Sequence, residues 1–152
     1  MTVDLSVIGT EFPPTDLTVD AGRLRFFAKA IGETNPVYTD VAAAKAAGYS
    51  NLPVPPTFLF SIELDSPEPF SWLSDLGVDL RYVLHGEQAF TYHSIAYPGE
   101  TLTATSTITD VYSKKGGALD FIVKDTAVTR ADCSAVADLK SVLVVRNPGV
   151  GK

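Results

Sequence analysis

Four long segments of strand-like composition fill the second half of the sequence, and they constrain its fold most strongly. From Tyr82 onward, β-branched and aromatic residues alternate with polar ones, and turn-forming residues divide the runs. We expect strands at about residues 81–94, 101–113, 118–131 and 135–146. Lys114-Lys115-Gly116-Gly117 is the clearest hairpin turn, because glycine permits the backbone angles that tight hairpins need. Together these segments predict an antiparallel sheet.

The first half of the chain carries helical patterns instead. Asp20 can cap a helix whose apolar residues recur at helical spacing, namely Leu24, Phe27, Ala28 and Ile31. Gly32 would end this helix. The alanine-rich stretch at residues 39–48 suits a second, shorter helix that closes with glycine. Between the two, Asn35-Pro36 predicts a loop with a defined bend, because proline keeps the preceding residue out of helical geometry.

A proline-rich lead, Leu52-Pro53-Val54-Pro55-Pro56, introduces an apolar segment at residues 58–64. We predict that this segment is the long central helix of the molecule, followed by a brief helical turn at residues 70–77. A further short strand near residues 16–19 could join the four longer ones. An apolar helix followed by consecutive strands predicts an α+β domain, in which a curved antiparallel sheet wraps around the helix.

Length and charge narrow the classes of function. With 152 residues the chain fits one domain, which we expect at residues 1–146, before a flexible tail at 147–152. The net charge of −6 argues against a nucleic-acid partner. No apolar run approaches the roughly 18 residues of a membrane helix. The first residues have neither the basic region nor the apolar segment of a secretory signal, so we expect a cytoplasmic protein without a membrane partner. A single cysteine, Cys133, excludes a thiolate metal site, and we expect no metal and no cofactor.

The loop between the first two helices contains the most specific motif. Residues 30–38 read Ala-Ile-Gly-Glu-Thr-Asn-Pro-Val-Tyr, which resembles the signature Gly-Asp-x-Asn-Pro-x-His of the MaoC-like, hot-dog-fold (R)-specific enoyl-thioester hydratases and 3-hydroxyacyl-thioester dehydratases. Three residues match the signature, namely Gly32, Asn35 and Pro36. Glu33 stands in the place of the catalytic Asp, and Tyr38 stands in that of the catalytic His.

A second segment refines the resemblance. His85 begins a His-Gly-Glu-Gln run that is similar to one in the amino-terminal-type, or FAS1-like dehydratase, branch of this family. In that branch, a hot-dog half with an eroded signature often pairs with a half that carries the intact one. The resemblance therefore implies a hot-dog fold, an acyl-CoA or acyl-carrier-protein thioester as ligand, and a homodimer or a heterodimer with a second hot-dog subunit.

Hydration of an enoyl thioester needs a base, an acid and donors for the thioester oxygen. Glu33 keeps a carboxylate but adds a methylene, and a misplacement of about 1 Å can cost on the order of a hundredfold in rate. Tyr38 is a phenol with an ordinary pKa of about 10, which suits hydrogen bonding better than proton abstraction near pH 7. Two histidines could replace the missing imidazole, His85 and His93, and His85 is the better candidate because of its His-Gly-Glu-Gln run. In the family the thioester-oxygen donors lie near the start of the central helix, which here corresponds to Thr57 or Phe58.

Three functions remain open from the sequence. The first is a hydro-lyase, a dehydratase or hydratase of fatty-acyl thioesters, that uses Glu33, Tyr38 and His85 or else supplies the substrate pocket to a catalytic partner. The second is an acyl-thioester-binding module without chemistry. The third, a thioesterase, shares the hot-dog fold but is disfavoured by the Asn35-Pro36 loop. In each of them Asn35, Pro36, Thr57 and Phe58 are the expected substrate-binding residues.

Overall fold

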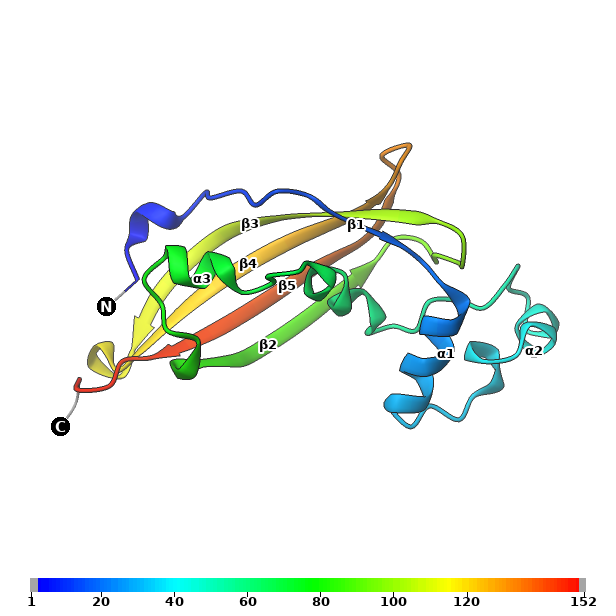
Figure 1. Ribbon diagram of the computed structural model, residues 1–152, viewed down its shortest axis with the longest axis horizontal. Helices are drawn as coiled ribbons and strands as arrows, with labels where there is room; N and C mark the ends of the chain where they lie inside the picture. The colour runs from blue at the N-terminus through cyan, green and yellow to red at the C-terminus, as the bar shows by residue number, and fades with distance from the viewer. Residues whose placement is uncertain (1–2, 151–152) are drawn as a thin grey trace.

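Five antiparallel strands form one curved sheet in the computed structural model, which describes residues 3–150 (Figure 1). Their order across the sheet is β1-β3-β4-β5-β2. The bounds are Thr15–Thr18 for β1, Val83–Tyr92 for β2, Thr101–Lys114 for β3, Leu119–Arg130 for β4 and Ala135–Arg146 for β5. The predicted α+β class and its antiparallel sheet are confirmed.

The inner face of the sheet follows from the alternation along the strands. In β3, Leu102, Ala104, Ser106 and Ile108 are buried, while the threonines between them are more exposed. β2 contains a bulge at Gly86, where the register to β5 shifts. A side chain on Gly86 would place its Cβ 2.8 Å from a methyl group of Val144, so only glycine fits there. The predicted turn between β3 and β4 is also present, with Gly116 and Gly117 at φ of 63° and 90°.

Two short helices, α1 (Ala21–Ala30) and α2 (Val41–Ala46), project beyond one end of the sheet (Figure 1). The Asp20 carboxylate accepts a hydrogen bond from the Arg23 amide at 2.9 Å and so caps α1, as the sequence predicts. Gly32, with φ of 71°, ends this helical region. A 3-10 turn at Pro36–Tyr38 connects the two helices.

The prediction of a long central helix is wrong. Residues 58–65 form two consecutive 3-10 turns, Phe58–Ser61 and Glu63–Asp65. In an α-helix the Ile62 amide would donate to the Phe58 carbonyl, but here it donates to the Leu59 carbonyl. The Phe58 carbonyl instead accepts a hydrogen bond from the Ser61 hydroxyl at 2.7 Å. Prolines flank this segment on both sides and limit any helix here to the residues between Pro56 and Pro67.

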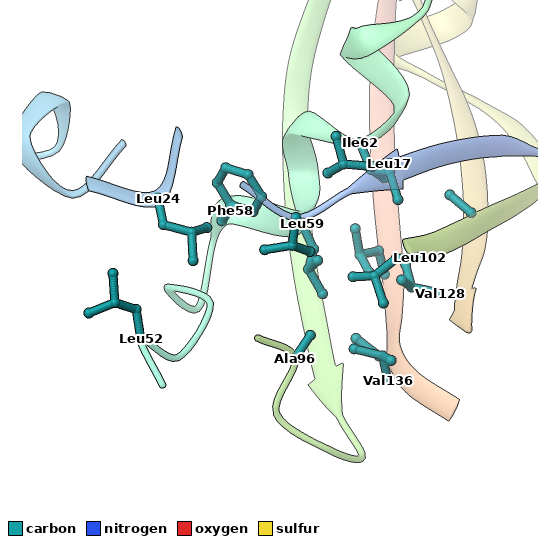
Figure 2. Close-up of a cluster of buried hydrophobic side chains, with 14 of the residues drawn as sticks. Leu17, Leu24, Leu52, Phe58, Leu59, Ile62, Ala96, Leu102, Val128 and Val136 are labelled. Atoms are coloured by element: carbon teal, nitrogen blue, oxygen red, sulfur yellow. The ribbon is translucent and has the colours of Figure 1, made fainter. Parts of the chain in front are cut away.

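The two turns and the short helix α3 (Ser71–Asp75) cross one face of the sheet (Figure 1). Leu59 and Ile62 pack with Leu102 and Val128 of the strands in one core cluster, which Figure 2 shows. Leu73 of α3 packs with Ile108, Ile122 and further residues in a second cluster. Apolar burial in these clusters, rather than helical hydrogen bonding, therefore fixes the position of the 3-10 segment.

The end of the described chain is partly anchored. Asn147, the first residue of the predicted flexible tail, is buried and donates to the Gly117 carbonyl at 2.7 Å and to the Asp120 carboxylate at 3.0 Å. Residues 151–152 of that predicted tail lie outside the described residues. Between residues 3 and 150, no helix has the length and apolar character that crossing a membrane requires.

Candidate functional site

The loop at residues 32–38 is held by its own side chains. The Asn35 carboxamide oxygen accepts a hydrogen bond from the Val37 amide at 3.1 Å, and Pro36 begins the 3-10 turn that contains Tyr38. Arg25 of α1 donates to the Thr39 carbonyl at 2.9 Å, which fixes the end of this turn. Asn35 and Pro36 therefore shape the loop through local bonds.

The Glu33 carboxylate turns back onto the same loop. Its Oε1 accepts a hydrogen bond from the Asn35 amide at 2.8 Å, while the Glu33 amide donates to the Ala28 carbonyl. One carboxylate oxygen is thus engaged in loop structure. The other has no hydrogen-bond partner in residues 3–150, so Glu33 keeps one oxygen that could accept a proton or a hydrogen bond.

Tyr38 lines a cavity of about 140 Å³ beside the loop. The walls come from four separate parts of the chain: Tyr38, Tyr49, Pro53, Val54, Pro56, Leu59, Tyr92, Ser94, Ile95, Ala96 and Val136. Most of this surface is apolar, and its polar atoms are mainly three phenols and one serine hydroxyl. A mostly apolar cavity with a few polar groups is the usual form of a small-molecule site.

The three phenols of the cavity, Tyr38, Tyr49 and Tyr92, make no side-chain hydrogen bonds within the described chain. Burial raises the pKa of Tyr92 to about 12, and Tyr38 adds to this effect. Burial also raises the pKa of Tyr38, with smaller contributions from Tyr49 and Glu33. The phenols of Tyr38 and Tyr92 are therefore neutral near pH 7 and can both donate and accept hydrogen bonds.

The Ser94 hydroxyl, in contrast, already forms hydrogen bonds within the protein. Its hydroxyl donates to the Ala135 carbonyl at 2.7 Å and accepts from Arg130 at 2.8 Å. Arg130 also donates to the Ile95 carbonyl at 2.8 Å and to Glu100 at 2.9 Å. This clamp fixes the connection between β2 and β3 that forms one wall of the cavity. Sequence reasoning did not identify Arg130, because its partners lie at least 30 residues away.

Comparison with known proteins now identifies the family. Residues 6–139 match the family of the FAS1-like, dehydratase domain region. The chain belongs to this family. A UPF0336 protein of Streptomyces avermitilis is 43% identical to this FAS1-like dehydratase chain over 117 residues, or 76% of this chain and 78% of that protein.

Solved structures establish the fold of the FAS1-like dehydratase chain. The HadBC (3R-hydroxyacyl-ACP dehydratase) complex of Mycobacterium tuberculosis matches it with a TM-score of 0.77 and 23% identity, over 95% of this chain and 99% of that one. The ChsH1-ChsH2 complex of the same organism matches with a TM-score of 0.73 and 24% identity, over 91% and 90%. At these identities the likeness shows the hot-dog fold alone, which confirms the fold predicted from the resemblance.

His85 lies away from the loop of the FAS1-like dehydratase chain. It stands near the start of β2, whereas the cavity residue Tyr92 ends that strand, and seven residues of strand span roughly 23 Å. The His85 ring contacts Phe60, with ring centroids 5.0 Å apart, and its Nε2 lies 3.0 Å from the Glu87 carbonyl. The structure therefore brings Glu33 and Tyr38 together but does not bring His85 to them.

The two candidate donors for a thioester oxygen differ in availability. Phe58 is buried against Phe27, and its amide donates to the Pro55 carbonyl at 3.0 Å. The Thr57 amide makes no hydrogen bond to any of residues 3–150, and its neighbour Pro56 lines the cavity. Thr57 is the more accessible donor, although the short 3-10 turn that follows it supplies little helix dipole.

Several cations that could contact the phosphates of CoA or of a carrier protein already have partners within the chain. Arg23 forms a bidentate ion pair with Asp65, at 2.6 and 2.8 Å, and Arg25 holds the Thr39 carbonyl. Lys114 lies over the rings of Tyr112 and Phe121. In the part of the chain that the structure describes, no group of three His, Cys, Asp or Glu residues could hold a metal ion.

A second polar grouping, unforeseen from the sequence, lies on the inner face of the sheet. The Glu63 carboxylate accepts from Lys124 at 2.6 Å, from Thr126 at 2.8 Å and from Ser106. The Lys124 ammonium also lies 5.2 Å from the centre of the Trp72 ring. Burial by itself would raise the pKa of Glu63, but the charge of Lys124 and these hydrogen bonds outweigh it and lower the pKa.

Proposed function

We propose that this FAS1-like dehydratase chain is the substrate-pocket subunit of an (R)-3-hydroxyacyl-thioester dehydratase or enoyl-thioester hydratase. A second hot-dog subunit with an intact Gly-Asp-x-Asn-Pro-x-His loop would carry out the proton transfers. The observation that carries this proposal is the loop itself, which keeps the family's shape through Asn35 and Pro36 but has a phenol where the imidazole belongs. A phenol with a raised pKa is a poor base near pH 7.

The free edge of the sheet supports a partner subunit. β2 is an edge strand of ten residues in the described sheet, and several apolar side chains on and beside it are exposed: Leu80, Tyr82, Leu84, Tyr92 and Ile95. A long, apolar edge strand is a ready site for pairing with another chain. The likeness to the HadBC and ChsH1-ChsH2 complexes also supports a hot-dog partner.

The test is hydration of crotonyl-CoA by the purified chain, alone and together with a co-expressed hot-dog protein that carries the intact signature. We expect little turnover by the chain alone and an increase of at least about a hundredfold in the complex, the usual contribution of positioned acid and base groups. Substituting the His of the partner's signature should abolish this gain. Robust turnover by the chain alone, lost in Glu33→Ala or His85→Ala, would contradict the proposal and assign the base to this chain.

A binding module without chemistry is the second candidate. The Glu33 carboxylate favours it, because one of its oxygens already serves the loop rather than facing a substrate. This candidate predicts saturable binding of CoA esters but no turnover with any partner. Release of free thiol from acyl-CoA would instead support a thioesterase.

A further inference from the structure

The inner end of the tyrosine-lined cavity is closed by well-packed core residues. Leu59, Ala96 and Val136 form this end, and each is at most 2% exposed. Figure 2 shows these three side chains coming from different segments of the chain, with Leu102 and Val128 beyond them. A ligand that extended past Leu59 would have to displace residues that pack as tightly as the rest of the core.

The residues that follow Leu59 in the chain are packed or paired. Ile62 is fully buried, and the neighbouring Glu63 is tied to Lys124, Ser106 and Thr126. An alkyl chain that reached this network would separate a largely buried ion pair, which is strongly unfavourable. The inner end of the cavity is therefore closed to a longer alkyl chain.

The polar groups of the cavity indicate which functional group its ligand contains. Ser94 is engaged by Ala135 and Arg130, whereas the phenols of Tyr38 and Tyr92 have no hydrogen-bond partner in the described chain. A phenol can both donate and accept a hydrogen bond, which matches an alcohol hydroxyl that does the same. A carboxylate ligand is disfavoured, because no cationic side chain among residues 3–150 lines the cavity.

We propose that this cavity binds a short 3-hydroxyacyl group, of butyryl rather than octanoyl length, with Leu59 and Val136 closing its inner end and the phenols of Tyr38 and Tyr92 binding the hydroxyl. This inference rests on the proposed function, since it takes the ligand to be an acyl thioester. It adds the chain length and the residues that determine it.

The length limit is tested by calorimetric titration of the full-length chain with acetyl-, butyryl-, octanoyl- and dodecanoyl-CoA. Affinity should rise about fourfold for each methylene up to butyryl, and should then fall for octanoyl and dodecanoyl. In Leu59→Ala the preferred length should move toward octanoyl, and Val136→Ala gives a second route to the same result if Leu59→Ala does not fold. Leu73→Ala is the matched control, because it removes the same atoms from the other core cluster and should keep the butyryl preference.

The hydroxyl contact is tested by comparing (R)-3-hydroxybutyryl-CoA with butyryl-CoA. The wild-type chain should prefer the hydroxylated ligand by about fivefold, the usual worth of one hydrogen bond. Tyr92→Phe should lose most of this preference, whereas Tyr112→Phe, a tyrosine outside the cavity, should retain it.

The outcomes separate this inference from the proposed function. Affinity that keeps rising through dodecanoyl-CoA, or an equal response of Leu59→Ala and Leu73→Ala, overturns the length limit while leaving acyl-thioester binding intact. An unchanged preference in Tyr92→Phe overturns the role of that phenol. If no CoA ester binds at any length, the proposed function itself fails.

Discussion

Two polar groupings lie on the same side of the sheet, and they differ in how completely the protein satisfies them. At the Glu63 cluster, carboxylate, ammonium and hydroxyl groups bond to one another, and the aromatic rings of Phe12 and Trp72 cover the ammonium. At the cavity, the phenols of Tyr38 and Tyr92 have no such partners in the described residues.

This difference distinguishes polar groups that stabilise the fold from polar groups that could bind a ligand. Buried polar groups in a folded protein are normally paired, so a fully paired cluster needs no ligand to explain it. Polar groups that line a cavity without partners are available to a ligand. By this criterion the strongly charged Glu63 cluster supports the fold, and the uncharged tyrosines are the better candidates for recognition.

The largest expected effect comes from breaking the paired cluster. Lys124→Ala should lower the free energy of unfolding by about 3 kcal/mol, because it leaves the Glu63 carboxylate largely buried without its counter-charge. Lys140→Ala removes an exposed ion pair with Asp125 and should change stability by at most about 0.5 kcal/mol. Urea titration measures both. A Lys124→Ala chain as stable as the Lys140→Ala chain would show that the cluster is not structural.

The next largest effect is expected at Arg130, a structural residue whose hydrogen bonds fix one wall of the cavity. Arg130→Ala should destabilise the chain by about 2 kcal/mol through loss of charged hydrogen bonds to Ser94, Ile95 and Glu100, and it should also weaken butyryl-CoA binding. Arg81→Ala loses only an exposed pair with Asp79 and serves as the control. Destabilisation without any change in binding would mean that this wall does not shape the cavity.

A smaller effect appears in acid. Because the folded pKa of Glu63 is lowered, its ionisation favours the native state at neutral pH, and this stability is lost as the pH falls below about 4.5 and through the folded pKa. Stability of the wild-type chain should therefore decline more steeply below pH 4.5 than that of Glu63→Gln. Parallel declines in urea titrations at pH 7, 4.5 and 3 would argue that Glu63 is not ion-paired.

The smallest effect is expected in alkali, at the cavity. The folded pKa of Tyr92 is raised to about 12, so the neutral phenol favours the native state below the unfolded pKa of about 10, and this stability is lost as the pH rises toward 12. Tyr92→Phe should show a shallower decline over this range. Absorbance of tyrosinate locates the ionisation directly, and a Tyr92 that titrates near 10 would contradict the raised pKa.

Local patterns predicted much of the fold. The Asp20 cap with its apolar spacing predicted α1, and the alternation after Tyr82 predicted the four long strands with the glycine turn between β3 and β4. The central helix failed for a physical reason. An apolar run of seven residues between prolines looks the same in sequence whether it forms an α-helix or 3-10 turns, and packing decides between them.

Only part of the candidate site could be predicted from the sequence. The loop residues Glu33, Asn35 and Tyr38 form a contiguous motif, so they could be named from the sequence. The other cavity residues, such as Tyr92 and Val136, come from distant strands, and only the sheet register brings them together. Ion pairs such as Lys124 with Glu63 are likewise invisible without the fold.

The buried carboxylate of Asp120 has a practical consequence for handling this protein. It accepts hydrogen bonds from the Val3 amide at 3.3 Å and from Asn147 at 3.0 Å, so both ends of the described chain meet at one residue, at the end of the sheet opposite α1 and α2 (Figure 1). Chains whose ends lie close together tolerate circular permutation. A short linker from beyond residue 147 to residue 3, with new ends opened at the turn of residues 132–134, should give a permuted protein that folds. Surface tethers or fluorescent labels attached at this end of the sheet would leave the cavity accessible (Figure 1).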